Sequence, residues 1–102
     1  MKEWLEWFRW KSIRMRVKID VDKGRLLDFV VQLEVDDEGW KPVVRYNYAH
    51  GQPHRDLIYR NGKKEKLWLN KSLKEVLDYG KRDIIKNWKK YIKECGYDVE
   101  ID

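Results

Sequence analysis

The chain has 102 residues, of which 42% are hydrophobic and 40% charged, and it carries a formal net charge of +5 at pH 7. This length predicts a single domain, residues 1–102, with enough apolar surface for a core of its own. No run approaches the roughly 18 to 20 apolar residues that cross a bilayer, and the first residues lack the apolar stretch of a signal peptide, so we expect a cytoplasmic protein without a membrane-spanning segment. The single cysteine, Cys95, excludes an internal disulfide and a multi-cysteine zinc site.

The positive charge lies mainly in the second half of the chain. Residues 1–59 hold 11 Lys and Arg against 10 Asp and Glu, whereas residues 60–94 hold 12 against 5. Such a local excess attracts nucleic acid, an acidic partner or an anionic surface. The alternative is a lysine-rich face that is only solvated, as in proteins of thermophiles. The absence of threonine and the presence of only two glutamines fit that composition.

The first residues are rich in aromatic side chains. Trp4, Leu5, Trp7, Phe8 and Trp10 stand too close together to be left in water. We expect this segment to pack on the rest of the fold as a short helix or an extra strand. An exposed aromatic patch that docks a partner is the alternative.

Two alternating runs predict a hairpin. Apolar residues occupy every second position of residues 13–21, and charged residues stand between them, which is the pattern of a half-buried strand. Residues 27–35 alternate in the same way after a turn at Lys23-Gly24. We expect the two strands to be antiparallel and to bury Met15, Val17, Ile19, Phe29, Val31 and Leu33.

Three further strands follow in the sequence. Residues 41–48 predict the third strand, whose core face the pattern leaves open. Its two sides carry Val43, Arg45 and Asn47, and Val44, Tyr46 and Tyr48. Residues 55–59 predict a fourth strand, and Asn61-Gly62 is a strong hairpin signal that leads into a fifth strand, residues 64–69.

Residues 72–95 change to the period of a helix. One stripe carries the small and apolar residues, namely Leu73, Val76, Leu77, Gly80, Ile84, Trp88, Tyr91, Ile92 and Cys95. Asn70 or Ser72 can cap the start of this helix, and Gly96 can close its end. Gly80 costs about 1 kcal/mol relative to alanine in a helix interior, which predicts either a bend or the close approach of a strand. The thiol of Cys95 falls on the apolar stripe, so we expect it to be buried.

Together these elements predict an α+β fold. We expect a twisted antiparallel sheet of four to six strands with one long C-terminal helix packed across it. Residues 97–102 alternate weakly and would add an edge strand.

Both histidines of the chain lie in residues 45–56, beside two arginines and two tyrosines. Gly51 and Pro53 predict a turn between two strands here, and binding or catalytic groups are concentrated on such loops. On a helix, His50 and His54 would share one face and could chelate a metal with the aspartate that follows, but the intervening glycine and proline argue against a helix. We therefore expect no metal site and no cofactor.

Acid-base chemistry on a phosphodiester is a second interpretation of the same residues. Cleaving RNA needs a base for the 2′-hydroxyl proton, an acid for the leaving oxygen and a cation for the charged transition state. Histidine suits the first two roles, which fall to His50 and His54, and Arg45 or Arg55 supplies the cation. Tyr46 would donate a hydrogen bond or stack on a base.

A third interpretation is purely structural. The two histidines then hydrogen-bond the backbone of the loop, and Arg55 pairs with Asp56 or Asp28 across the sheet. The sequence pattern disfavours the metal site most, but by itself it does not decide among the three interpretations.

The segment also resembles a family of small prokaryotic domains of unknown function. Their shared core reads approximately V-R-Y-D-x-A-H-G-x-x-H-R-D, and residues 44–56 match it. The similarity continues through Asn61-Gly62 into residues 83–91, which match a D-I-x-x-N-W-x-x-Y helix of the family. Asn47 stands where the family has Asp, so a role for that carboxylate in orienting a histidine or binding a metal does not carry over.

More distantly, the arrangement of hairpins, histidines and closing helix is similar to TumE-type toxins of toxin-antitoxin pairs. That resemblance implies a small RNA-directed toxin whose partner is a DNA-binding antitoxin. Our leading hypothesis is a metal-independent ribonuclease with a catalytic set of His50, His54, Arg45, Arg55 and Tyr46. The alternative is a non-catalytic module of a mobile element or defence cassette that binds nucleic acid or protein. Its binding residues would be Lys86, Lys89, Lys90 and Lys93, with the aromatic N-terminus.

Overall fold

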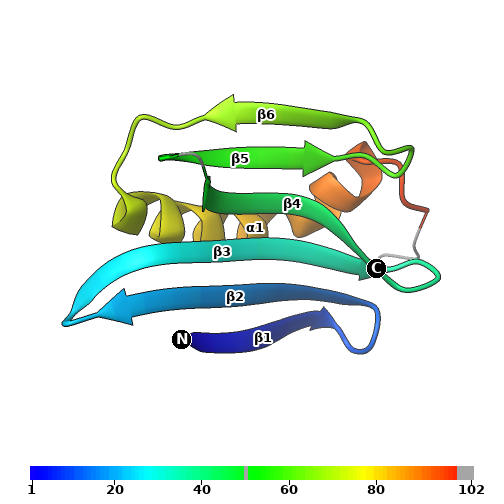
Figure 1. Cartoon of the computed structure of the whole chain (residues 1–102). Helices are drawn as coiled ribbons and strands as arrows, with labels where there is room; N and C mark the ends of the chain where they lie inside the picture. Colours follow the sequence, from blue (N-terminus) through cyan, green and yellow to red (C-terminus); the bar gives the residue numbers. More distant parts are fainter. Residues whose placement is uncertain (50, 99–102) are drawn as a thin grey trace.

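The computed structural model describes residues 1–49 and 51–98, which form one antiparallel sheet and one helix (Figure 1). The elements in chain order are β1 (Lys2–Arg9), β2 (Ile13–Asp22), β3 (Arg25–Asp36), β4 (Trp40–Ala49), β5 (Gln52–Ile58), β6 (Lys64–Trp68) and α1 (Leu73–Glu94). The six strands lie side by side in the order of the chain, each antiparallel to the next. The predicted α+β class is thereby confirmed, and the aromatic N-terminus is the extra strand β1. Within the described residues, no helix is long and apolar enough to cross a membrane.

The turns explain why consecutive strands pair. Lys23 and Gly24 both have positive φ, 50° and 76°. Two such residues form the tight turn whose twist matches that of paired strands. The predicted hairpin of β2 and β3 follows from this turn, with Val17 opposite Val31 and Ile19 opposite Phe29.

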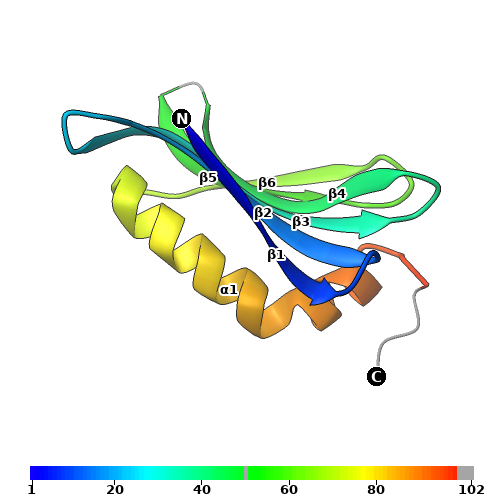
Figure 2. The same ribbon diagram turned by 90° about the horizontal axis from the view of Figure 1, so that it is seen from below.

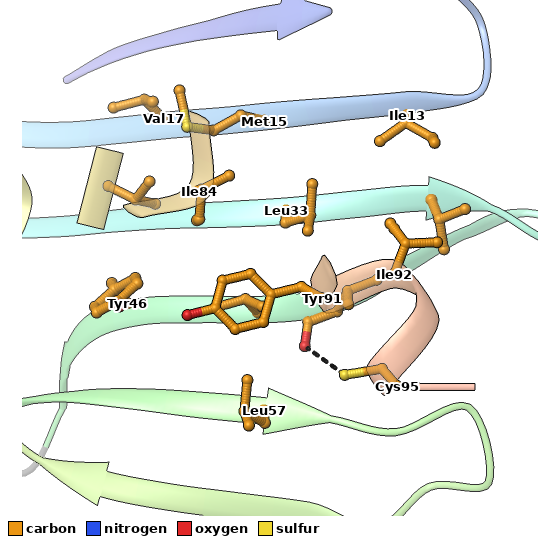
Figure 3. Packing of buried hydrophobic residues seen from close by; sticks show 14 of the residues in the cluster. Ile13, Met15, Val17, Leu33, Tyr46, Leu57, Ile84, Tyr91, Ile92 and Cys95 are labelled. Carbon is orange, nitrogen blue, oxygen red and sulfur yellow. Dashed lines mark hydrogen bonds between the residues drawn. The ribbon is translucent and has the colours of Figure 1, made fainter. Parts of the chain in front are cut away.

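The helix α1 lies across one face of the sheet, and no helix covers the other face in the described part of the chain (Figure 2). The core lies between α1 and the sheet (Figure 3). Its fully buried members from the strands include Ile13, Met15, Val17, Phe29, Val31, Leu33, Val44 and Tyr46, and those from the helix include Val76, Ile84 and Ile92. Phe8 of β1 stacks on Trp88 of α1, with 5.3 Å between ring centroids. We call the uncovered side the open face.

Two bulges change the burial that simple alternation predicts. The first lies between Asp20 and Val21 of the β2 and β3 pairing and leaves Leu27 38% exposed. The second lies opposite Leu33 and Glu34, and it buries Val43 as well as Val44 although the two are adjacent in β4. A bulge inserts one residue into one strand, so the inside and outside positions shift beyond it.

Both ends of α1 are closed as the sequence predicts. The Ser72 side chain accepts a hydrogen bond from the Glu75 amide, and the Glu75 carboxylate accepts one from the Ser72 amide. Gly96 has a φ of 90°, and the Tyr97 amide donates to the Ile92 carbonyl. Residues 97 and 98 are not in a strand, so the predicted edge strand is absent there, and residues 99–102 lie outside the described residues.

The thiol of Cys95 is buried at the end of α1, as predicted. It is 1% exposed, and its Sγ lies 3.9 Å from the Val43 carbonyl oxygen, to which it donates (Figure 3). Burial raises the pKa of this thiol to about 11. Because the thiolate is the reactive form, Cys95 is a packing residue.

Gly80 allows a strand to approach the helix. A methyl group in place of its hydrogen would lie 2.8 Å from Cγ of Tyr46, whose ring is fully buried. Of the two explanations that the sequence allows for this glycine, the structure has the close approach.

We predict that Gly80→Ala destabilises the protein. In an exposed helix, replacing glycine by alanine would raise the free energy of unfolding by about 1 kcal/mol. Here we expect a net loss of up to about 2 kcal/mol, because overpacking a core costs about 1 to 3 kcal/mol. The sign is read from urea denaturation, with the exposed Lys86→Ala as control. A Gly80→Ala protein more stable than the wild type would contradict the close contact.

Candidate functional site

Residues 45–56 run along the end of β4, through a turn and into β5, so their side chains alternate between the two faces of the sheet. Across the strands, Arg45 pairs with Asp56, Tyr46 with Arg55, and Asn47 with His54. Residues paired directly across two strands point to the same side. The open face therefore receives Arg45, Asn47, His54 and Asp56, while the helix-covered face receives Tyr46 and Arg55.

The five predicted catalytic residues do not share one surface. Arg45 and His54 lie on the open face, and Tyr46 and Arg55 lie under or beside α1. His50 lies outside the described residues. Any site built from this set is thus limited to its open-face members.

His54 is held by the protein on all sides. It is 1% exposed, and its ring lies 5.1 Å from that of Trp68 in β6. Its Nε2 lies 3.3 Å from Oδ2 of Asp56, and its Nδ1 lies 3.3 Å from the Gln52 carbonyl oxygen. Both ring nitrogens face protein oxygens, and the contact with the Gln52 carbonyl is the backbone contact that the structural interpretation predicts for this histidine.

Asp56 and Arg55 do not form the ion pair that the structural interpretation predicts. The two adjacent residues point to opposite faces, and the cation beside Asp56 is Lys66, 4.0 Å from Oδ1. Arg55 instead places Nη1 3.5 Å from the Tyr91 hydroxyl. In the described part of the chain Arg55 has no carboxylate within ion-pair distance, and its buried Nε has no hydrogen-bond partner.

Arg45 belongs to a polar ladder that crosses three strands of the open face. Its Nε donates to Oε1 of Gln32 at 2.6 Å, and the amide nitrogen of Gln32 donates to Glu34. Glu34 is only 2% exposed, and Arg14 Nε donates to its Oε1 at 2.7 Å. The arginines make burial of the Glu34 carboxylate tolerable, because a buried charge without a partner is very costly.

Aromatic residues cover one end of this ladder. The Arg14 guanidinium lies 3.7 Å from the ring centroid of Trp40 and 5.6 Å from that of Trp7. Trp10 packs edge-on against Trp7 with 4.9 Å between centroids, and it is otherwise exposed. The expected packing of this segment as an extra strand is confirmed by β1, although Trp4 and Leu5 in the strand and Trp10 just after it are exposed.

A second polar cluster joins the sheet to the helix. Oδ2 of Asp83 accepts hydrogen bonds from the hydroxyls of Tyr46 and Tyr91, each at 2.6 Å. Oδ1 of the same carboxylate accepts one from Asn87 at 2.7 Å. Burial, and next the hydrogen bond to Asp83, raise the pKa of both tyrosines, that of Tyr91 to about 12.

Sequence reasoning assigned no role to Asp83 and Asn87, and it placed Tyr91 only on the apolar stripe of the helix. The signal was present in their i, i+4, i+8 spacing, which places them on one helix face. Tyr46, proposed as a catalytic group, is the partner of this face in β4. Its geometry is that of a docking residue, since its hydroxyl is occupied and its ring packs under Gly80.

The predicted binding lysines lie on the outer surface of α1. Lys86, Lys89, Lys90 and Lys93 are all exposed, and so is Arg82 one turn earlier. We call these five residues the basic helix surface. The opposite stripe of α1, with Ile84, Tyr91 and Ile92, is buried in the core, so the basic helix surface faces away from the sheet. The helix itself lies on the side of the sheet opposite the open face (Figure 2).

Among the described residues, no three His, Cys, Asp or Glu side chains lie close enough together to hold a metal ion.

Nearly the whole chain matches one family model. The chain belongs to the family described as Domain of unknown function (DUF7718). The family model matches residues 1–98, which include every strand and α1. This agrees with the predicted membership in an uncharacterised domain family. No curated protein and no solved structure matches the chain.

The tyrosines bound to Asp83 predict a loss of stability in alkaline solution. Unfolded tyrosines ionise near pH 10, whereas Tyr91 does so at about 12 in the folded chain. The stabilisation is therefore complete below pH 10 and declines as the pH rises towards about 12. We expect Tyr91→Phe to be less stable at neutral pH and to lose less of its stability over this range.

The measurement is urea denaturation at a series of pH values, with phenolate absorbance followed in parallel. Tyr79→Phe is the matched control, because Tyr79 is exposed and its ring contact with Tyr46 survives the change. Equal pH dependence in the wild type and Tyr91→Phe would contradict the raised pKa of Tyr91.

Proposed function

We propose that this protein is a non-catalytic RNA-binding module that holds the phosphate backbone on the basic helix surface. The observation that carries the proposal is the placement of five exposed cations on the last three or so turns of α1. Phosphate contacts from Lys and Arg supply most sequence-independent affinity for nucleic acid. The choice of RNA rests on the resemblance to TumE-type toxins.

Few carboxylates of α1 lie near the basic helix surface, so its positive charge is largely uncompensated. The Asp83 side chain points towards the sheet and accepts hydrogen bonds from two tyrosines and from Asn87. Glu94 is the exposed carboxylate of the same turns. Positions 82, 86, 89, 90 and 93 fall on one stripe, so their charges act on a partner together.

The environment of His54 favours binding over catalysis. A general acid or base must reach the reacting proton within hydrogen-bond distance. His54 is 1% exposed with both nitrogens beside protein oxygens, and Arg55 is on the other face. The basic helix surface needs no such rearrangement to meet a phosphate backbone.

We predict that RNA affinity falls with salt and depends on the helix lysines. Changing Lys86, Lys89, Lys90 and Lys93 to Gln should weaken binding of a generic single strand by at least about tenfold at low salt. The slope of log affinity against log salt should fall by up to about 3, or 0.7 per lost contact. Binding is measured by fluorescence anisotropy.

The matched control removes the same charge elsewhere. Lys41, Lys63, Lys64 and Lys71 are exposed lysines outside α1, and their change to Gln alters the net charge equally. This control should lose much less affinity than the helix variant. Equal losses in the two variants, or affinity that does not depend on salt, would remove the basic helix surface from the function.

RNA cleavage is a second candidate, favoured by one juxtaposition on the open face. Arg45, Asn47 and His54 lie on adjacent strands there, with Asn47 directly opposite His54. His50 follows β4 in the sequence, and the resemblance to TumE-type toxins implies an RNA-directed toxin with an antitoxin partner. On this proposal His50 and His54 act as acid and base and Arg45 binds the phosphate.

The cleavage assay uses purified protein and RNA with and without EDTA. If the site is catalytic, cleavage should persist in EDTA and be lost in His50→Ala and in His54→Gln. His54 is buried, so thermal unfolding must show that its variant is folded. Cleavage that both variants retain would exclude this candidate.

A further inference from the structure

A groove of about 400 Å³ lies on the open face across β2, β3 and β4. Its polar lining comprises Arg16, Lys18, Asp28, Gln32, Arg45 and Asn47. All six side chains belong to the face that α1 leaves uncovered, so the groove is separate from the basic helix surface.

The groove carries an excess of positive charge, and two of its three cations have no carboxylate partner in the described part of the chain. Arg16, Lys18 and Arg45 face a single lining carboxylate, Asp28. Arg16 is paired within the protein, because its Nη1 lies 3.8 Å from Glu3 and its Nε lies 3.3 Å from Glu34.

The other two cations of the groove, Lys18 and Arg45, make fewer contacts with the protein than Arg16 does. Within residues 1–49 and 51–98, neither Lys18 nor Arg45 has a carboxylate at ion-pair distance, and Arg45 uses only Nε, to bind Gln32. Two terminal nitrogens of its guanidinium are therefore left for a ligand. A guanidinium fork of this kind matches the oxygens of a phosphate.

Asn47 provides the second, independent observation. Its side chain is 9% exposed and lines the groove, yet it has no hydrogen-bond partner in the described part of the chain. Its amide is open to the groove, so its donor and its acceptor are available to a bound molecule. A ligand that offers a hydroxyl or an amide edge would satisfy it.

We propose that this groove binds a nucleotide, with the phosphate on Arg45 and Lys18 and the ribose or base edge on Asn47. The groove volume falls in the usual range of small-ligand sites, about 300 to 1,000 Å³. The nucleotide is either free or one unit of a single RNA strand, because both present the same phosphate and polar edges. The site does not depend on RNA binding at α1, which uses the opposite side of the molecule.

The test is an amide NMR titration of the whole chain with five probes. These are adenosine 5′-monophosphate, uridine 5′-monophosphate, adenosine, inorganic phosphate and a short oligouridylate. We expect saturable shifts in β2, β3 and β4 with a mononucleotide or with the oligonucleotide, and much weaker ones with adenosine or phosphate alone. Response to a mononucleotide assigns the free ligand, and response to the oligonucleotide alone assigns a strand.

Variants decide whether the groove is responsible. Lys18→Gln should weaken binding by about tenfold, since it removes one charge contact worth about 1.4 kcal/mol. Asn47→Leu keeps the volume and removes the hydrogen bonds, and we expect a similar loss. Lys63→Gln, at an exposed lysine between β5 and β6, is the matched control and should leave nucleotide affinity unchanged.

Two results would overturn the proposal: no saturable shift in these strands with any probe, or nucleotide affinity unchanged in Lys18→Gln. Lys18 has no carboxylate partner, so its variant should fold even if Asn47→Leu does not. Loss of RNA binding in the helix-lysine variant together with unchanged nucleotide binding would leave this site standing.

Discussion

Successive side chains of a strand point to opposite faces of a sheet, and this constraint divides residues 45–56 into two sites with different roles. Tyr46 and Arg55 face α1, whereas Arg45, Asn47 and His54 face the open side. Residues that look like one cluster in the sequence are thereby separated by the thickness of the sheet. A function that needs all of them on one substrate does not fit the geometry.

The helix-covered half fixes the position of α1. The Tyr46 ring fits against Gly80, its hydroxyl meets Asp83, and Tyr91 binds the same carboxylate from the helix. The hydrogen bond from Tyr46 links β4 to the middle of the helix. Because this face of α1 packs on the sheet, the basic helix surface on the opposite side of the helix faces solvent.

The open half is organised by polar contacts in place of a second hydrophobic layer. Glu34, Gln32 and the arginines beside them form a ladder, and Trp7 and Trp40 cover Arg14 at its end. In this ladder Glu34 is paired with Arg14 and Arg16, whereas Arg45 contacts only the neutral Gln32. Arg45 and Lys18 therefore have no carboxylate partner among the described residues. The molecule thus presents two cationic surfaces on opposite sides, one convex along the helix and one hollowed in the sheet.

Local periodicity in the sequence determined the hairpin of residues 13–21 and 27–35, the helix with its N-cap Ser72 and the closing Gly96, and the burial of Cys95, because each depends on near neighbours in the chain. The core face of β4 was decided only by tertiary structure, since a bulge opposite Leu33 sets its register and buries both Val43 and Val44. The same holds for His54, which Trp68 of β6 and Asp56 enclose, and for Asp83, whose tyrosine partners come from two elements. The sequence located the residues that carry polar chemistry, but their grouping depends on strand register and helix docking, which are long-range interactions that a local pattern does not encode.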